Sequence, residues 1–169
     1  MSCSTDDLMI FDFSKDSDIS NWRIEDDRVM GGISQGKFEL SDQGHGHFYG
    51  NVTVESNGGF SSVQNNSVDV EVDPSQSLQI KVKGDGNTYQ FRVQPSNSAR
   101  ESYIKEFKTN GEWQTIKVKL SDMEPTYRGR DLDMPNFNFD QIKHLRFMIG
   151  TKKVDQKFEL FIDSIELVD

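Results

Sequence analysis

Apolar and polar residues alternate along most of this chain, as they do in strands with one buried face. The alternation is clearest in residues 78–83 (LQIKVK) and 89–94 (YQFRVQ). No stretch of ten or more residues carries a sustained helical period of 3.6 residues. We therefore predict about ten strands, over residues 8–13, 37–41, 47–55, 68–72, 78–83, 89–94, 103–107, 113–120, 141–150 and 158–168.

Turn signals separate these predicted strands, for example Asp73-Pro74 and Asp85-Gly86-Asn87. One-sided alternation favours antiparallel pairing. The pattern predicts an all-β fold, an antiparallel β-sandwich or jelly roll. Because the chain has no internal repeat, linker or low-complexity tract, we expect residues 1–169 to form a single β-sandwich domain, with residues 1–7 as a disordered tail.

Two segments depart from the alternation. We interpret Trp22-Arg23-Ile24 as a bend that places an aromatic ring in the core. The segment from Ser121 to Asn138 contains Pro125 and Pro135, and we predict a long loop there. Loops of this length inside a compact domain tend to be functional or mobile.

Composition narrows the classes of partner. The 34% hydrophobic content is low, whereas aromatic residues reach 11% with 12 phenylalanines, which suits a thin sandwich core. The net charge of −9 argues against nucleic-acid binding and against an anionic membrane surface. It is compatible with protein partners, with neutral ligands such as glycans, and with a hard cation.

The termini and the cysteine content point to a cytoplasmic protein. Cys3 is the only cysteine, so no intrachain disulfide is possible. No apolar run approaches the roughly 20 residues that a membrane-spanning helix needs. The start of the chain is acidic and lacks an apolar segment, unlike a signal peptide or a mitochondrial transit peptide.

Two glycine-pair stretches are the main candidates for function. They are residues 26–36 (DDRVMGGISQG) and 56–63 (SNGGFSSV). Neither has the spacing of a phosphate-binding loop, so a backbone-packing role for the glycines is the default interpretation. In that interpretation Met30 and Phe60 anchor in the core. The polar residues beside the glycines, Asp27, Arg28 and Asn57, would form a recognition surface, and the two stretches would lie side by side if the intervening hairpin folds back.

Metal sites have weaker support in the sequence. His45 and His47 would share one face of a strand, but no further ligand lies at suitable spacing, so we favour a solvated hairpin and expect no cofactor. Asp12 and Asp163 could contribute to a Ca²⁺ site if the first and last strands are neighbours.

Three other features suggest partners or chemistry. The segment Tyr127-Arg128-Gly129-Arg130 is either a solvated loop or an arginine–aromatic hot spot for protein recognition. Trp113 and Tyr103 are either buried or platforms that stack on sugar rings. No nucleophile elbow or Cys–His pair is present, so an enzyme would have to use paired carboxylates.

Taken together, the motifs resemble the complex I intermediate-associated protein 30 family. The resemblance runs from about Leu8 to Val168 and is carried by Trp22, DRVMGGIS at 27–34, FYG at 48–50, NGGFSSV at 57–63, Trp113 with Ile116 and Val118, RGR at 128–130, and Phe158-Glu159-Leu160 with Asp163 and Ile165. The glycine-pair motifs in this order are specific, whereas either one alone would be weak.

The resemblance implies a galactose-binding-like β-sandwich, the fold of many carbohydrate-binding modules. Its best-known members chaperone membrane-arm intermediates of respiratory complex I without known catalysis, and this chain is similar in size to stand-alone bacterial members. We therefore expect a non-enzymatic binding module, a protein-assembly or chaperone-like factor without direct membrane insertion. The alternatives are a glycan-binding sandwich and, more weakly, an enzyme with paired carboxylates. The expected binding residues are Asp27, Arg28, Met30, Gly31, Gly32, Ser34, Asn57, Gly58, Gly59, Phe60, Arg128 and Arg130.

Overall fold

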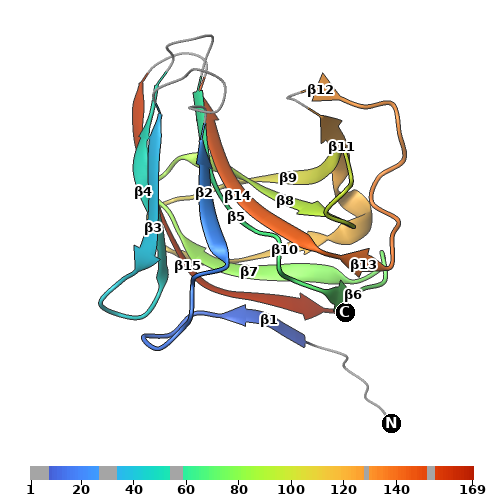
Figure 1. The fold of residues 1–169 in the computed structure, drawn as a ribbon, viewed down its shortest axis with the longest axis horizontal. Helices are drawn as coiled ribbons and strands as arrows, with labels where there is room; N and C mark the ends of the chain where they lie inside the picture. Colours follow the sequence, from blue (N-terminus) through green and yellow to red (C-terminus); the bar gives the residue numbers. More distant parts are fainter. Residues whose placement is uncertain (1–7, 27–33, 54–58, 128–129, 152–154) are drawn as a thin grey trace.

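Two antiparallel sheets face each other in the computed structural model, which describes residues 8–26, 34–53, 59–127, 130–151 and 155–169 (Figure 1). The first, here called the β15 sheet, contains β1 (Leu8–Asp12), β3 (Gln35–Leu40), β4 (Gly46–Val52), β7 (Ser77–Lys83), β10 (Trp113–Lys119) and β15 (Gln156–Val168). The second, the β14 sheet, contains β2 (Trp22–Asp26), β5 (Gly59–Asn65), β8 (Thr88–Gln94), β9 (Ser102–Lys108), β11 (Glu124–Tyr127), β12 (Arg130–Asp131) and β14 (His144–Thr151). The short strands β6 (Val70–Glu71) and β13 (Gln141–Ile142) pair with each other beside them. The all-β antiparallel prediction is confirmed.

The strand orders place β15 and β14 inside their sheets. The β15 sheet runs β10-β7-β15-β4-β3, and β1 also pairs with β15. The first half of β15 pairs with β4 and its second half with β1, from Asp12 opposite Ser164 to Leu8 opposite Leu167. The β14 sheet runs β12-β11-β9-β8-β14-β5-β2.

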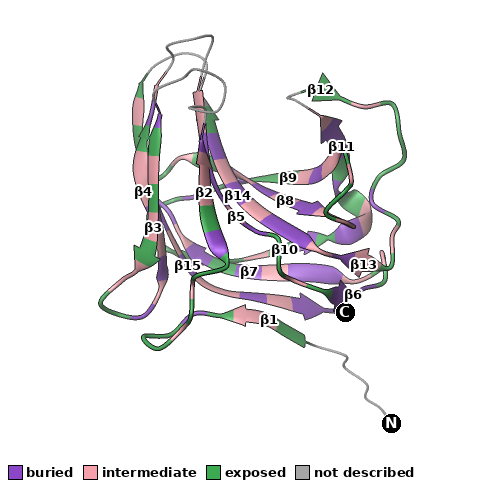
Figure 2. Ribbon diagram, viewed as in Figure 1, coloured by how far each residue is buried: buried purple, intermediate pink, exposed green. Residues whose placement is uncertain are grey.

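The core lies between the two sheets and follows the predicted alternation. Leu160 and Ile162 of β15 belong to the same core as Phe147 of β14 and Phe91 of β8, and all four side chains are fully buried. Figure 2 shows the resulting change between buried and less buried positions along the strands. Gly36 leaves room for Ser61 between the sheets, because a Cβ built on Gly36 would lie 2.0 Å from Ser61 Oγ and the hydroxyl would have to move.

Aromatic rings fill one end of the sandwich. Trp22, Phe11, Phe13 and Phe38 lie with neighbouring ring centroids 4.4–5.9 Å apart. Trp22 is only 6% exposed, so the prediction that it enters the core is confirmed. The predicted bend is wrong, because Trp22 begins β2, which pairs with β5 along its whole length.

The predicted long loop from 121 to 138 is also partly structured. A 3-10 helix (Leu120–Asp122) leads into β11, which pairs with both β9 and β12. Pro125 has no N–H to donate within β11, but its carbonyl accepts a hydrogen bond from Leu132 N at 3.2 Å. Figure 1 shows the β14 sheet curling from β2 and β14 round to β11 and β12, on the side away from β7 and β15.

Candidate functional site

The predicted binding residues divide into described and undescribed ones. Asp27, Arg28, Met30, Gly31, Gly32, Asn57, Gly58 and Arg128 lie outside the described residues. The strands that flank the two glycine-pair stretches are neighbours, since β2 ends at Asp26 and pairs with β5, which begins at Gly59. The chain therefore leaves for the first stretch and returns from the second at the same end of the β14 sheet.

The four described members of that set have different surroundings. Ser34 is buried, and its Oγ accepts a hydrogen bond from Thr53 N at 2.9 Å, so it ties the segment before β3 to the end of β4. Gly59 and Phe60 open β5 and pair with the end of β14. Arg130 is exposed on β12. The strand order separates β12 from β5 by β11, β9, β8 and β14, so Arg130 does not join Phe60.

Phe60 does not anchor in the core. Ser61 and Val63 of β5 are the buried residues that face the β15 sheet, so Phe60 points to the opposite side. We call this side, away from the β15 sheet, the outer face of the β14 sheet. The side chains of the middle strands on this face are Phe60, Ser62 and Gln64 of β5, His144, Arg146 and Met148 of β14, and Gln90, Arg92 and Gln94 of β8.

A hydrogen-bonded network occupies the centre of the outer face. Gln64 Oε1 accepts from Arg146 Nη2 at 2.6 Å and contacts His144 Nε2 at 2.7 Å, while Gln64 Nε2 donates to Glu25 Oε2 at 2.7 Å. Arg146 Nη2 also pairs with Glu25 Oε2 at 3.3 Å. We call Glu25, Gln64, His144 and Arg146 the Arg146 network. Since an amide oxygen can only accept, His144 Nε2 must carry the proton and Nδ1 must be the bare nitrogen.

The charged groups of this face are unusually buried for a surface. The Arg146 side chain is 18% exposed and His144 is 5% exposed. Burial lowers the pKa of Arg146, although the adjacent Glu25 carboxylate opposes the shift. Burial and then the charge of Arg146 lower the pKa of His144 to about 4, so this imidazole is neutral at pH 7.

Arg92 lies directly opposite Arg146 on the neighbouring strand β8. Its Nε and Nη2 both donate to Gln90 Oε1, at 2.9 and 2.7 Å. Burial, followed by the charge of Arg146, lowers the pKa of the Arg92 guanidinium to about 10, so it stays charged at pH 7. The middle of the outer face therefore presents two adjacent guanidinium groups surrounded by amides, with Met148 beside them and Phe60 further along, near the start of β5.

Sequence reasoning missed Arg92, Arg146 and Gln64. Each occupies a polar position of a predicted strand, where side chains are usually solvated. Their proximity depends on the pairing of β5, β14 and β8, which are far apart in the chain. The only hint in the sequence is that two predicted strands, residues 89–94 and 141–150, each carry an arginine at a polar position.

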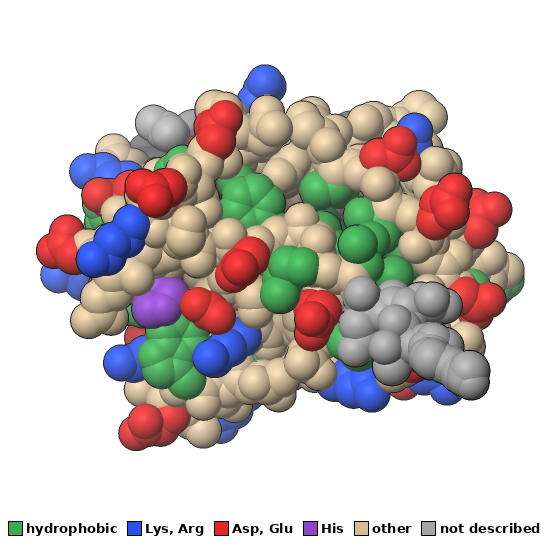
Figure 3. All heavy atoms as spheres, turned by 90° about the horizontal axis from the view of Figure 1, so that it is seen from below, with side chains coloured by type: hydrophobic (Ala, Val, Ile, Leu, Met, Phe, Trp, Pro, Cys, Tyr) green, Lys and Arg blue, Asp and Glu red, His purple; other side chains and the backbone are tan. Residues whose placement is uncertain are grey.

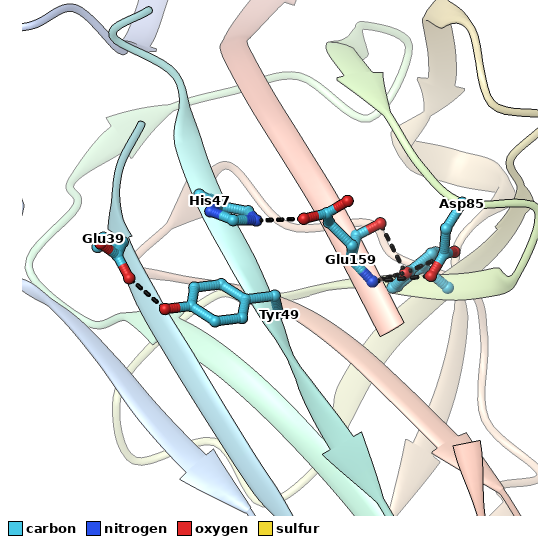
Figure 4. Close-up of polar contacts among 6 residues, drawn as sticks. Glu39, His47, Tyr49, Asp85 and Glu159 are labelled. Carbon is cyan, nitrogen blue, oxygen red and sulfur yellow. Dashed lines mark hydrogen bonds and ion pairs between the residues drawn. The ribbon is translucent and has the colours of Figure 1, made fainter. Parts of the chain in front are cut away.

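The opposite side of the molecule carries a cluster of rings. On the outward side of the β15 sheet His47 stacks between Tyr49 and Phe161, with centroids 4.2 and 4.4 Å away. His47 Nε2 contacts Glu159 Oε2 at 2.8 Å, and the Tyr49 hydroxyl donates to Glu39, as Figure 4 shows. Figure 4 also shows Asp85 beside Glu159, whose backbone N donates to Asp85 Oδ2 at 2.7 Å.

A second ring contact joins the residue before β4 to the start of β10. His45 packs on Trp113 at 4.6 Å between centroids, and His45 Nε2 lies 3.4 Å from Asp163 Oδ1. Trp113 is 38% exposed, whereas Tyr103 is buried and cannot be a platform. In the view from below the molecule, apolar side chains form separate patches among acidic and basic ones (Figure 3).

The described structure gives little support to the predicted calcium site and to an enzyme with paired carboxylates. β1 and β15 are neighbours, as the calcium hypothesis requires, but Asp163 already contacts His45 and Lys81. Within the described ranges, no group of three or more His, Cys, Asp or Glu side chains could hold a metal ion. One surface hollow is lined by two carboxylates, those of Glu71 and Asp140. Both residues are exposed, and the described residues that line the hollow include no arginine or histidine. The calcium site and the enzyme with paired carboxylates stay predictions.

No helix in the described part of the chain is long and apolar enough to cross a membrane. The comparison with solved structures identifies carbohydrate-binding modules as similar folds. A family 11 module from Clostridium thermocellum, in complex with a beta-1,3-1,4-mixed-linked tetrasaccharide, has a TM-score of 0.68 at 20% identity, covering 99% of this chain and 97% of that one. The family 11 module of the cellulosomal cellulase Lic26A-Cel5E from the same organism gives 0.67 at 17% identity, covering 98% and 96%.

A family 29 carbohydrate-binding module gives a TM-score of 0.58 at 13% identity, covering 98% of this chain and 90% of that one. These similarities confirm the predicted galactose-binding-like jelly-roll sandwich. No curated protein sequence matches the chain. The sequence pattern of one protein family, Complex I intermediate-associated protein 30 (CIA30), matches residues 11–162. With nearly the whole chain matched and the fold in agreement, this protein belongs to the complex I intermediate-associated protein 30 family.

Proposed function

We propose that this protein is a non-enzymatic binding module, a protein-assembly or chaperone-like factor related to the respiratory complex I assembly proteins. Membership of the family supports this role. The proposal places the protein-binding surface on the outer face of the β14 sheet, beside the end from which the glycine-pair stretches leave.

The observation that carries this proposal is the composition of the middle of the outer face. Arg92, Arg146 and Met148 occupy adjacent outward positions there, and Phe60 lies diagonal to Met148 toward the start of β5. The outward positions of β5, β14 and β8 include no lysine, aspartate or glutamate, and the Glu25 carboxylate of the Arg146 network comes from the edge strand β2. The centres of protein interfaces are enriched in arginine, methionine and aromatic residues and depleted of lysine and carboxylates. Half-buried side chains held by hydrogen bonds also lose little conformational entropy on binding.

Affinity purification tests this assignment. Tagged full-length protein would be recovered from detergent-solubilised native membranes and extract, and the co-purifying proteins would be quantified by mass spectrometry. Phe60→Ala/Met148→Ala should reduce recovery of the specific partners by at least about tenfold, because truncating two central apolar contacts removes on the order of 1–2 kcal/mol each. The control Trp113→Ala, on the opposite sheet, should recover the same partners as wild type. Equal recovery by the double variant, with an unchanged thermal unfolding curve, would remove the outer face as the binding surface.

Glycan binding is the second candidate, and one observation favours it. Trp113 is exposed beside His45, and an exposed indole can stack on a sugar ring. The similar solved structures include carbohydrate-binding modules of families 11 and 29. A glycan array should then give a hit that Trp113→Ala abolishes, while the absence of any hit would retire this candidate.

A further inference from the structure

Arginines line a row that crosses the outer face. Reading across the paired strands, Arg23 of β2 lies opposite Gln64, Gln64 opposite Arg146, and Arg146 opposite Arg92. Like charges directly opposite each other destabilise a sheet. The pair formed by Arg92 and Arg146 therefore requires negative charge nearby to offset the repulsion between the two guanidinium groups.

Over the ranges that the structure describes, only one of the two guanidinium groups, that of Arg146, has a carboxylate beside it. Arg146 has the Glu25 carboxylate at 3.3 Å. Arg92 donates only to Gln90, whose amide oxygen accepts hydrogen bonds but carries no net charge. Among the residues that the structure describes, no carboxylate lies within ion-pair distance of Arg92. One positive charge of the pair is thus uncompensated in a chain whose net charge is −9.

One edge of the Arg92 guanidinium is occupied by Gln90, and the other has no partner among the described residues. Gln90 occupies the side of the guanidinium formed by Nε and Nη2. Nη1 has no hydrogen-bond partner among the described residues, and it is not one of the buried unpaired atoms. Nη1 therefore keeps some exposure to solvent, and the end of a guanidinium fork matches the geometry of a carboxylate.

We infer that Arg92 and Arg146 form a receptor for a carboxylate on an acidic peptide segment of the partner protein. This inference rests on the proposed protein-binding function and names the chemistry of its ligand. A carboxylate would complement the positive charge of the two guanidinium groups. The apolar side chains of Met148, directly opposite Gln90, and of Phe60 supply the argument for a peptide, because they would contact apolar residues that flank the acidic one.

The test uses a defined probe. A pentapeptide of sequence GLELG, acetylated at its N-terminus and amidated at its C-terminus, would be titrated into the full-length protein, with GLQLG, capped in the same way, as its neutral counterpart. The Nε–Hε cross-peaks of the arginines in an NMR spectrum report contact, and the titration gives Kd. We expect GLQLG to bind about tenfold more weakly than GLELG, because a charge-assisted hydrogen-bonded pair is lost. Added salt should also weaken the binding of GLELG.

Variants locate the receptor. Arg92→Gln should raise the Kd for GLELG about tenfold, and Arg92→Lys should give an intermediate loss because it keeps the charge without the planar fork. Arg23→Gln is the matched control, since it removes the same charge from an exposed residue of the edge strand β2, and it should change Kd by less than about twofold. Thermal unfolding of each variant checks that the fold is intact.

Several outcomes would overturn the inference. They are an unchanged Kd in both Arg92 variants, equal losses in Arg92→Gln and Arg23→Gln, and binding of an oligogalacturonate in place of the peptide. If GLELG and GLQLG bind equally while Phe60→Ala/Met148→Ala still abolishes partner recovery, the carboxylate receptor fails and the proposed function stands. If GLELG binding depends on Arg92 but Phe60→Ala/Met148→Ala recovers the same partners as wild type, the carboxylate receptor stands and the proposed function fails.

Discussion

The neutral, buried His144 should make the protein less stable as the pH falls below 6.5. His144 Nε2 donates to Gln64 Oε1, which also accepts from Arg146 Nη2 at 2.6 Å. Protonation of Nδ1 would add a second positive charge beside Arg146, at a nitrogen that has no hydrogen-bond partner in the described structure. Acid therefore favours the unfolded chain, in which the imidazole is solvated.

The size of this effect follows from the pKa of His144, which is about 4 in the folded protein against 6.5 for an ordinary histidine. Between these values the unfolded chain binds more protons than the folded one, so the free energy of unfolding falls as the pH falls. The loss is absent above pH 6.5, reaches about 2 kcal/mol at pH 5, and levels off near about 3 kcal/mol below pH 4.

Urea unfolding of wild type and His144→Gln at pH 7.5, 6 and 5 would measure it. Trp22, buried among Phe11, Phe13 and Phe38, supplies the fluorescence signal. Carboxylates also titrate near pH 5, but they do so in both proteins, so the difference between the two isolates His144. His144→Gln should be the less stable protein at pH 7.5, and this gap should shrink by about 2 kcal/mol at pH 5.

Parallel stability curves for the two proteins between pH 7.5 and 5 would refute the reasoning. A direct check is the pKa of His144 by NMR. A value above 6 would mean that the imidazole is not held neutral by burial and by Arg146.

Three further substitutions test the packing, each by urea unfolding at pH 7.5. Phe147→Ala should cost about 3–5 kcal/mol, because the ring is fully buried between the sheets, and a loss below 1 kcal/mol would contradict its place in the core. Gly36→Ala should cost about 1–3 kcal/mol, since the new methyl would meet Ser61 Oγ, and Gly36→Ala/Ser61→Gly should recover part of this loss. Asp85→Ala should cost about 1–2 kcal/mol by leaving the backbone N of Glu159 without its carboxylate acceptor, whereas no change would show that water replaces that acceptor.

Much of the fold could be predicted because burial on one side imposes a period of two. Residues 78–83 and 89–94 match β7 and β8 almost residue for residue. The misassigned elements are those in which the local pattern is weak. β2 contains charged residues at three of its five positions, and β11 contains a proline, so both depend on pairing with strands that are distant in the chain.

The candidate site was harder to predict for a related reason. Gln64, Arg92 and Arg146 look like ordinary solvent-facing residues, since alternation assigns them to the polar side of their strands. Only the register that places Arg146 opposite both Gln64 and Arg92 turns them into a half-buried group. Phe60 shows the converse error, because an aromatic residue beside glycines suggested a core anchor, whereas the register turns it outward.

The position of β15 has a consequence for the synthesis of the protein. β15 is the last element of the chain, yet it holds β1, β4 and β7 together. On the ribosome these earlier strands emerge long before their common neighbour, so the β15 sheet cannot close until residues 156–168 have left the exit tunnel. The unpaired edges of β4 and β7 are exposed during that interval, and a nascent chain stalled before residue 156 should need a chaperone to stay free of aggregation.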